Sequence, residues 1–71
     1  MFIDETVAVR GDLPGELLKA FGELKEYYDA GDWFQFDMLF DLVEVRTKAY
    51  YLAGKISRED LDMIFRKYGV S

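Results

Sequence analysis

The stretch Trp33–Ala53, WFQFDMLFDLVEVRTKAYYLA, decides the fold because it is too apolar to stand alone in water. It contains no glycine and no proline, as expected of one uninterrupted helix. At about 100° per residue four of its five charges, Asp37, Asp41, Glu44 and Lys48, fall in one narrow strip. The sequence therefore predicts a central helix over residues 33–53 that other elements must cover.

Two apolar flanks border the charged strip of this central helix. The Phe36 flank consists of Phe36, Leu39, Phe40, Val43, Thr47 and Tyr50, and the Phe34 flank consists of Phe34, Met38, Leu42, Val45, Ala49 and Leu52. A surface helix usually has one apolar stripe a little over about 100° wide, and this helix has more. This wider apolar surface predicts contact with several neighbouring elements. The sequence leaves open which flank packs within the same chain.

The helix before the central one should span residues 14–29. Its stripe is narrow and regular, formed by Leu17, Phe21, Leu24 and Tyr28. We expect Pro14 in the first turn, with Asp12 as a cap, and Gly31 at the end. Asp32 should then cap the central helix, which Gly54 closes in a left-handed conformation. The short connection predicts two antiparallel or steeply crossed helices, and the narrow stripe can cover only one flank.

A third helix should span residues 58–68, with Ser57 as its N-cap and Asp60 at the third helical position. Gly69 should end it, with Val70 against Phe65. The segment Gly54–Leu61 resembles the second half of an EF-hand loop. The first, third and fifth ligand positions would then be Ala49, Tyr51 and Ala53, which carry no carboxylate. We interpret the segment as a structural corner.

Residues 1–12 form an arm that contains the short β-prone run Thr6–Val9. A single strand cannot satisfy its own backbone. We expect the arm to lie extended over the bundle, and the alternative is pairing with the same segment of a second copy. The tripeptide at residues 10–12 spells Arg-Gly-Asp, the integrin-recognition sequence, which we interpret as a turn.

Composition sets the class of protein. The 71 residues make one domain, with no cysteine for disulfides and no histidine for zinc. The net charge of −5 disfavours direct binding to nucleic acid or to an anionic membrane. The charge divides unevenly, with a net of −8 over residues 1–45 and +3 over residues 46–71. The N-terminus lacks the basic residues of a signal peptide, so we expect a cytoplasmic protein.

Candidate chemical sites are few. The carboxylates of Asp37, Asp41 and Glu44 could hold a divalent cation weakly or act as an acid, but their strip fits a solvated helix face better. The sequence has no histidine, no cysteine, no glycine-rich phosphate loop and no serine with a plausible base. We therefore predict no catalytic residues, no metal and no cofactor, and a protein that is not an enzyme.

Arg46 lies between the two apolar flanks, where a charge is costly unless it is paired. Either its head reaches water, or it pairs with an acid of another helix or another subunit. Trp33 borders the acidic strip as an exposed aromatic. Aromatic residues and arginine are enriched at protein interfaces, so these positions favour a contact surface.

The sequence thus predicts an all-α, three-helix bundle with a long central apolar helix and an extended N-terminal arm. Our leading hypothesis is a non-catalytic protein-interaction module, homodimeric through the central helix or bound to a foreign protein. We expect the interface at Phe34, Met38, Leu42, Val45, Arg46 and Ala49. The alternative is an acidic nucleic-acid mimic that occupies the basic groove of a nucleic-acid-binding protein.

Overall fold

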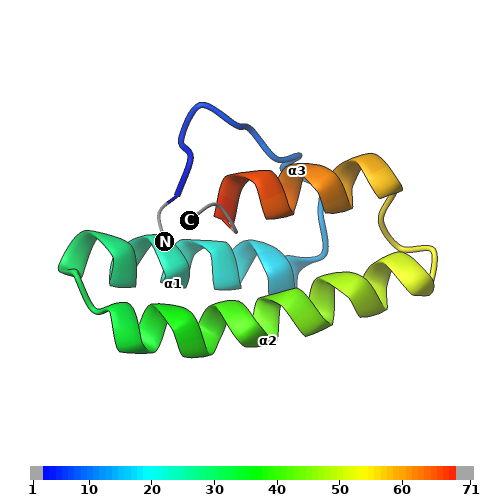
Figure 1. The fold of residues 1–71 in the computed structure, drawn as a ribbon. Helices are drawn as coiled ribbons and strands as arrows, with labels where there is room; N and C mark the ends of the chain where they lie inside the picture. The colour runs from blue at the N-terminus through cyan, green and yellow to red at the C-terminus, as the bar shows by residue number, and fades with distance from the viewer. Residues whose placement is uncertain (1–2, 69–71) are drawn as a thin grey trace.

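Three helices build the protein in a computed structural model that describes residues 3–68. They are α1 (Gly15–Ala30), α2 (Trp33–Leu52) and α3 (Arg58–Tyr68). Helices α1 and α2 form an antiparallel hairpin, and α3 packs on the same side of α2 as α1 does (Figure 1). The predicted all-α, three-helix bundle is confirmed, and each predicted helix end lies within one residue of the observed one.

The ends of the helices follow local rules. Gly31 closes α1 with a φ of 70°, in the left-handed region that glycine enters without strain. The Asp32 side chain accepts a hydrogen bond of 3.2 Å from the Gln35 backbone N–H and so caps α2. Gly54, just beyond α2, also has a positive φ of 74°. These three predicted positions are confirmed.

The start of α1 differs from the prediction. Pro14 is the N-cap itself, not a residue of the first turn, and no side chain of residues 3–68 caps the helix. Its carbonyl accepts hydrogen bonds from the backbone N–H groups of Leu17 and Leu18. Asp12 therefore lies two residues before the N-cap and forms an ion pair of 3.4 Å with Arg10. The prediction that Asp12 caps α1 is wrong because the helix begins later than Asp12 can reach.

The core lies between α2 and the elements on one side of it. Side chains from all three helices are fully buried there, namely Leu17, Leu24, Phe36, Val43, Thr47 and Ile64. The rings of Phe21 and Tyr68 stack at a centroid distance of 4.7 Å and join α1 to α3. Because α1 and α3 share this side, one continuous core serves the whole domain.

The N-terminal arm crosses α3 (Figure 1). The Asp4 backbone N–H donates to the Lys67 carbonyl at 2.8 Å, and the Lys67 ammonium donates to the Val7 carbonyl at 2.6 Å. Ile3, Val7 and Leu13 bury their side chains. The arm therefore lies over the bundle, as expected, and over residues 3–68 the β-prone run forms no strand.

The predicted contact of Val70 with Phe65 after Gly69 lies outside residues 3–68. Within those residues, no helix combines the length and the apolar character that a membrane crossing requires.

Candidate interaction surface

The Phe34 flank of α2 is exposed along its whole length. The exposed fractions are 71% for Phe34, 57% for Met38, 64% for Val45 and 82% for Leu52. Leu42 is half exposed, and Ala49 is also exposed. An isolated exposed leucine is ordinary, but a continuous apolar row is uncommon on the surface of a monomeric protein.

The Phe36 flank lies on the opposite side of the same helix and fills the core. Phe36 and Val43 are almost completely buried, at 0% and 1% exposure. Helices α1 and α3 both pack on this side, so nothing in the described chain covers the other side of α2 (Figure 1). All six residues predicted for the interface, namely Phe34, Met38, Leu42, Val45, Arg46 and Ala49, are therefore solvent-exposed.

Two shallow hollows adjoin the exposed flank. One, of about 210 Å³, lies between α1 and α2 and includes Leu39, Leu42 and Arg46 in its wall. The other, of about 290 Å³, lies beside Ala49 and Ala53 near the end of α2. Small side chains at these two positions leave room for a residue of a bound protein. The Phe34 flank is thus a row of exposed side chains with two shallow hollows beside it.

Arg46 forms an ion pair with Glu16 of α1 at 3.0 Å. The second oxygen of Glu16 accepts a hydrogen bond of 2.8 Å from the Tyr50 hydroxyl, and this hydrogen bond raises the pKa of Tyr50. Arg46 therefore pairs with an acid of another helix, which was one of the alternatives left open by the sequence. Both partners are about half exposed, so the pair adds little stability and mainly orients Arg46.

The acidic strip of α2 remains open to solvent. Asp37 and Asp41 are exposed and Glu44 is half-buried, and none of the three forms an ion pair within residues 3–68. The Lys48 ammonium lies 6.0 Å from the centre of the Phe65 ring instead of contacting Glu44. In the same part of the chain, no three acidic side chains come together in a group that could hold a metal ion.

Trp33 is half exposed in the first turn of α2. Its ring meets Tyr28 edge-on at 5.5 Å and Phe36 at 6.3 Å. The sequence predicted its exposure but not these contacts, because Tyr28 belongs to the stripe of another helix. Trp33 thus connects the core to the exposed surface at the α1–α2 turn.

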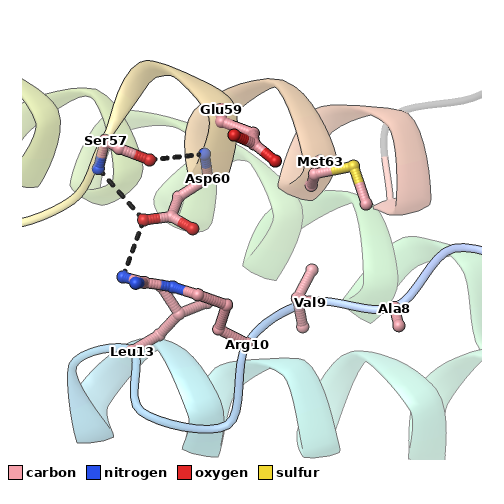
Figure 2. Close-up of a pocket in the computed structure, with 8 residues that line it drawn as sticks. All are labelled: Ala8, Val9, Arg10, Leu13, Ser57, Glu59, Asp60 and Met63. Atoms are coloured by element: carbon pink, nitrogen blue, oxygen red, sulfur yellow. Dashed lines mark hydrogen bonds and ion pairs between the residues drawn. The ribbon is translucent and has the colours of Figure 1, made fainter.

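A third hollow lies away from the exposed flank, between the arm and α3 (Figure 2). It has a volume of about 220 Å³ and is lined by Ala8, Val9, Arg10, Leu13, Ser57, Glu59, Asp60 and Met63. Asp60 accepts hydrogen bonds from the Ser57 backbone N–H at 3.0 Å and from the Arg10 guanidinium at 2.8 Å. The Ser57 hydroxyl in turn accepts from the Asp60 backbone N–H at 3.0 Å, which completes a capping box.

The polar groups of this third hollow connect the arm to the start of α3. The hydrogen bond from the Ser57 backbone N–H lowers the pKa of Asp60, burial acts against it, and the nearby Arg10 guanidinium adds to the lowering. A carboxyl held in this way remains ionised at neutral pH and is poorly suited to proton transfer. The sequence predicted the Ser57 cap, but the contact with Arg10, 50 residues away, has no local signal.

The exposed Phe34 flank is therefore the feature of the described chain that α1, α3 and the arm leave without a structural partner. Comparison of the chain with protein-family models, with curated proteins and with solved structures gave no match.

Proposed function

We propose that this protein is a small non-catalytic interaction module that forms a homodimer through the Phe34 flank of α2. The observation that carries the proposal is the row of exposed apolar side chains opposite the core. A domain of this size gains only about 3–5 kcal/mol from a single core. Covering the row with a second copy removes more apolar surface from water and adds stability.

The composition of the surface supports a protein partner. Its centre is aliphatic, with Met38, Leu42 and Val45, and an aromatic residue, Phe34, lies near one end. The charged side chains Asp37, Asp41 and Arg46 border the row and do not interrupt it. An apolar centre with a polar rim is the usual anatomy of a stable protein interface.

The test is the solution mass, measured by size-exclusion chromatography with light scattering across a dilution series. We expect twice the chain mass, falling toward one chain mass on dilution. Leu42→Asp places a charge in the middle of the row and should give a folded monomer. Asp37→Asn changes an exposed residue outside the row and should leave a dimer.

A monomer at every concentration would overturn the homodimer. Circular dichroism of Leu42→Asp must retain the helical spectrum of the unaltered protein, because a misfolded variant would also lose its partner. Leu42 is half exposed and outside the core, so the fold should tolerate this substitution.

The acidic nucleic-acid mimic remains the second proposal, favoured by the open carboxylates of Asp37 and Asp41. Other acids of the same run have internal partners: Glu16 pairs with Arg46, and Asp29 with Lys25. These pairs reduce the free negative charge that a mimic requires. Binding of a mimic to a basic groove should weaken steeply with added salt, whereas an apolar dimer should not.

Charge reversal separates the two proposals. Asp37→Lys, at an exposed position outside the row, should weaken binding of a mimic to a basic protein and leave the dimer in place. Leu42→Asp should have the opposite effect on the two activities.

A further inference from the structure

We propose that the two copies pair with their α2 helices antiparallel, about a two-fold axis that passes between Val43 and Glu44. This inference rests on the homodimer proposed above and adds its orientation and register. The partner is a second copy of this chain, and the contact is a short two-helix seam. Spacing, side-chain size and charge along α2 each bear on this arrangement.

The exposed row has the spacing of a coiled-coil seam. From Met38 onward its members, Met38, Leu42, Val45, Ala49 and Leu52, are separated by four, three, four and three residues. This alternation keeps every member on one line that faces a partner helix. It spans two heptads, enough for a short helix pair and in keeping with the length of α2.

Side-chain size favours the antiparallel orientation. About the proposed axis, Leu42 faces Val45 of the partner subunit and Met38 faces Ala49 of the partner subunit. Each layer then combines a larger and a smaller side chain, as close packing requires. A parallel pair would set Met38 against Met38 and Ala49 against Ala49, which crowds one layer and leaves space in the other.

Charge complementarity points the same way. Asp41 and Lys48 lie on the same side of the seam, seven residues apart. In an antiparallel pair such positions face each other, so Asp41 meets Lys48 of the partner subunit twice, once on each side of the axis. Neither residue has an ion-pair partner within residues 3–68.

A parallel pair of α2 helices would form fewer favourable ion pairs between the two copies. There Asp41 would face Arg46 of the partner subunit, but Arg46 is already held by Glu16 at 3.0 Å. Lys48 would face Ala53 of the partner subunit and gain no pair. The dipoles of neighbouring helices also oppose parallel pairing. Helices α1 and α3 lie on the far side of α2 (Figure 1), so the described chain does not obstruct the approach of the second copy.

Disulfide trapping tests the orientation, because the chain contains no cysteine of its own. The single variants Met38→Cys and Ala49→Cys are mixed in equal amounts, equilibrated and mildly oxidised. The disulfide-linked adducts are then identified by mass spectrometry. We expect the mixed 38–49 adduct in excess over both symmetric adducts. Two copies of residue 38 would lie about 16 Å apart along the helix axes, well beyond the roughly 7 Å that a disulfide spans. Glu26→Cys, on the exposed surface of α1, is the control that should form no preferred adduct.

The outcomes separate this inference from the homodimer itself. Symmetric 38–38 and 49–49 adducts from a dimeric protein would show parallel pairing and overturn only the orientation. A dimer by light scattering that yields no adduct above the control would place the interface elsewhere and overturn both the seam and the register. A monomer by light scattering would remove the homodimer and this inference together.

A charge exchange tests the register independently. Asp41→Lys should weaken the dimer on the order of tenfold, because two favourable pairs become two repulsive ones. Adding Lys48→Asp to the same chain should restore the affinity, since the pairs re-form with their signs exchanged. In a parallel dimer the second substitution would restore nothing, and that result would overturn the proposal.

Discussion

The two flanks of α2 belong to one helix and are similarly apolar, yet one is buried and the other is exposed. Phe36 on the first flank has 0% exposure, whereas Phe34, two residues earlier, has 71%. The two flanks do not differ in helix propensity, so the difference in exposure comes from the placement of α1 and α3 on one side of α2. Burial here is a property of the neighbours and not of the helix, which is why the same chemistry can stabilise the fold on one face and bind a partner on the other.

Truncating the same residue type on each flank should give the largest contrast. Phe36→Ala should cost about 3–5 kcal/mol in the free energy of unfolding, because it removes a buried ring and leaves a cavity. Since a domain this small holds only about that much stability, the variant should be largely unfolded at room temperature. Phe34→Ala should keep the helical fold when the protein is dilute enough to be monomeric. Urea unfolding followed by circular dichroism measures both, and equal losses would show that the Phe34 flank is also core.

The exposed flank should instead make stability depend on concentration. If it is covered by a second copy, raising the protein concentration 100-fold should stabilise the folded dimer by about 2.7 kcal/mol. The midpoint of thermal unfolding should rise accordingly. Val45→Asp, in the middle of the exposed row, should remove this dependence. An unaltered protein whose midpoint is the same at all concentrations would contradict the contrast drawn between the flanks.

Acid should weaken the contact between the arm and α3 before it affects either flank of α2. The pKa of Asp60 is lowered in the folded protein, so its contribution to stability is present above the ordinary carboxyl pKa of about 3.9. That contribution is lost as the pH falls through the lower folded value. Asp60→Asn should therefore be less stable near neutral pH and show a flatter decline below about pH 4. Thermal unfolding across pH 2–7 measures this, and Asp37→Asn, on the exposed strip, should keep the decline of the unaltered protein.

A smaller effect is expected from removing a buried hydroxyl group on the Phe36 flank. The Thr47 hydroxyl on the Phe36 flank is buried and has no hydrogen-bond partner among residues 3–68. Thr47→Val keeps the shape and removes this cost, so it should stabilise the fold by about 1 kcal/mol, or about 4–8 °C in the unfolding midpoint. The reverse exchange on the other flank, Val45→Thr, should leave the stability of the monomer nearly unchanged. A destabilised Thr47→Val would show that the hydroxyl has a partner.

The smallest effect is expected at the surface ion pair that connects α1 to the rim of the exposed row. Arg46→Gln should change the free energy of unfolding by less than about 1 kcal/mol, because both Arg46 and Glu16 are about half exposed. A double-mutant cycle with Glu16→Gln measures the pair directly. A coupling energy well above that value would show that the ion pair contributes more to the stability of the α1–α2 hairpin than its exposure implies.

Periodicity and end signals predicted most of the fold. The narrow stripe of α1, with Leu17 and Leu24, also indicated that only one flank of α2 could be covered within the hairpin. Periodicity alone could not choose between the flanks, since both are apolar and the choice depends on where α3 packs. Nothing near Arg10 in the sequence points to its contact with Asp60. The start of α1 was misplaced because Asp12 is a good capping residue that lies just too far from the helix.

The arm has a consequence for the order in which the fold forms. Its hydrogen bond from Lys67 to Val7 joins positions 60 residues apart, whereas the α1–α2 hairpin is closed by neighbours in sequence. Closing a long loop costs more chain entropy than closing a short one, and contacts of this kind are made late. We expect the arm to dock last and to detach first. Hydrogen exchange at the Asp4 amide would then report local opening, while the amides in the middle of α2 report unfolding of the whole domain.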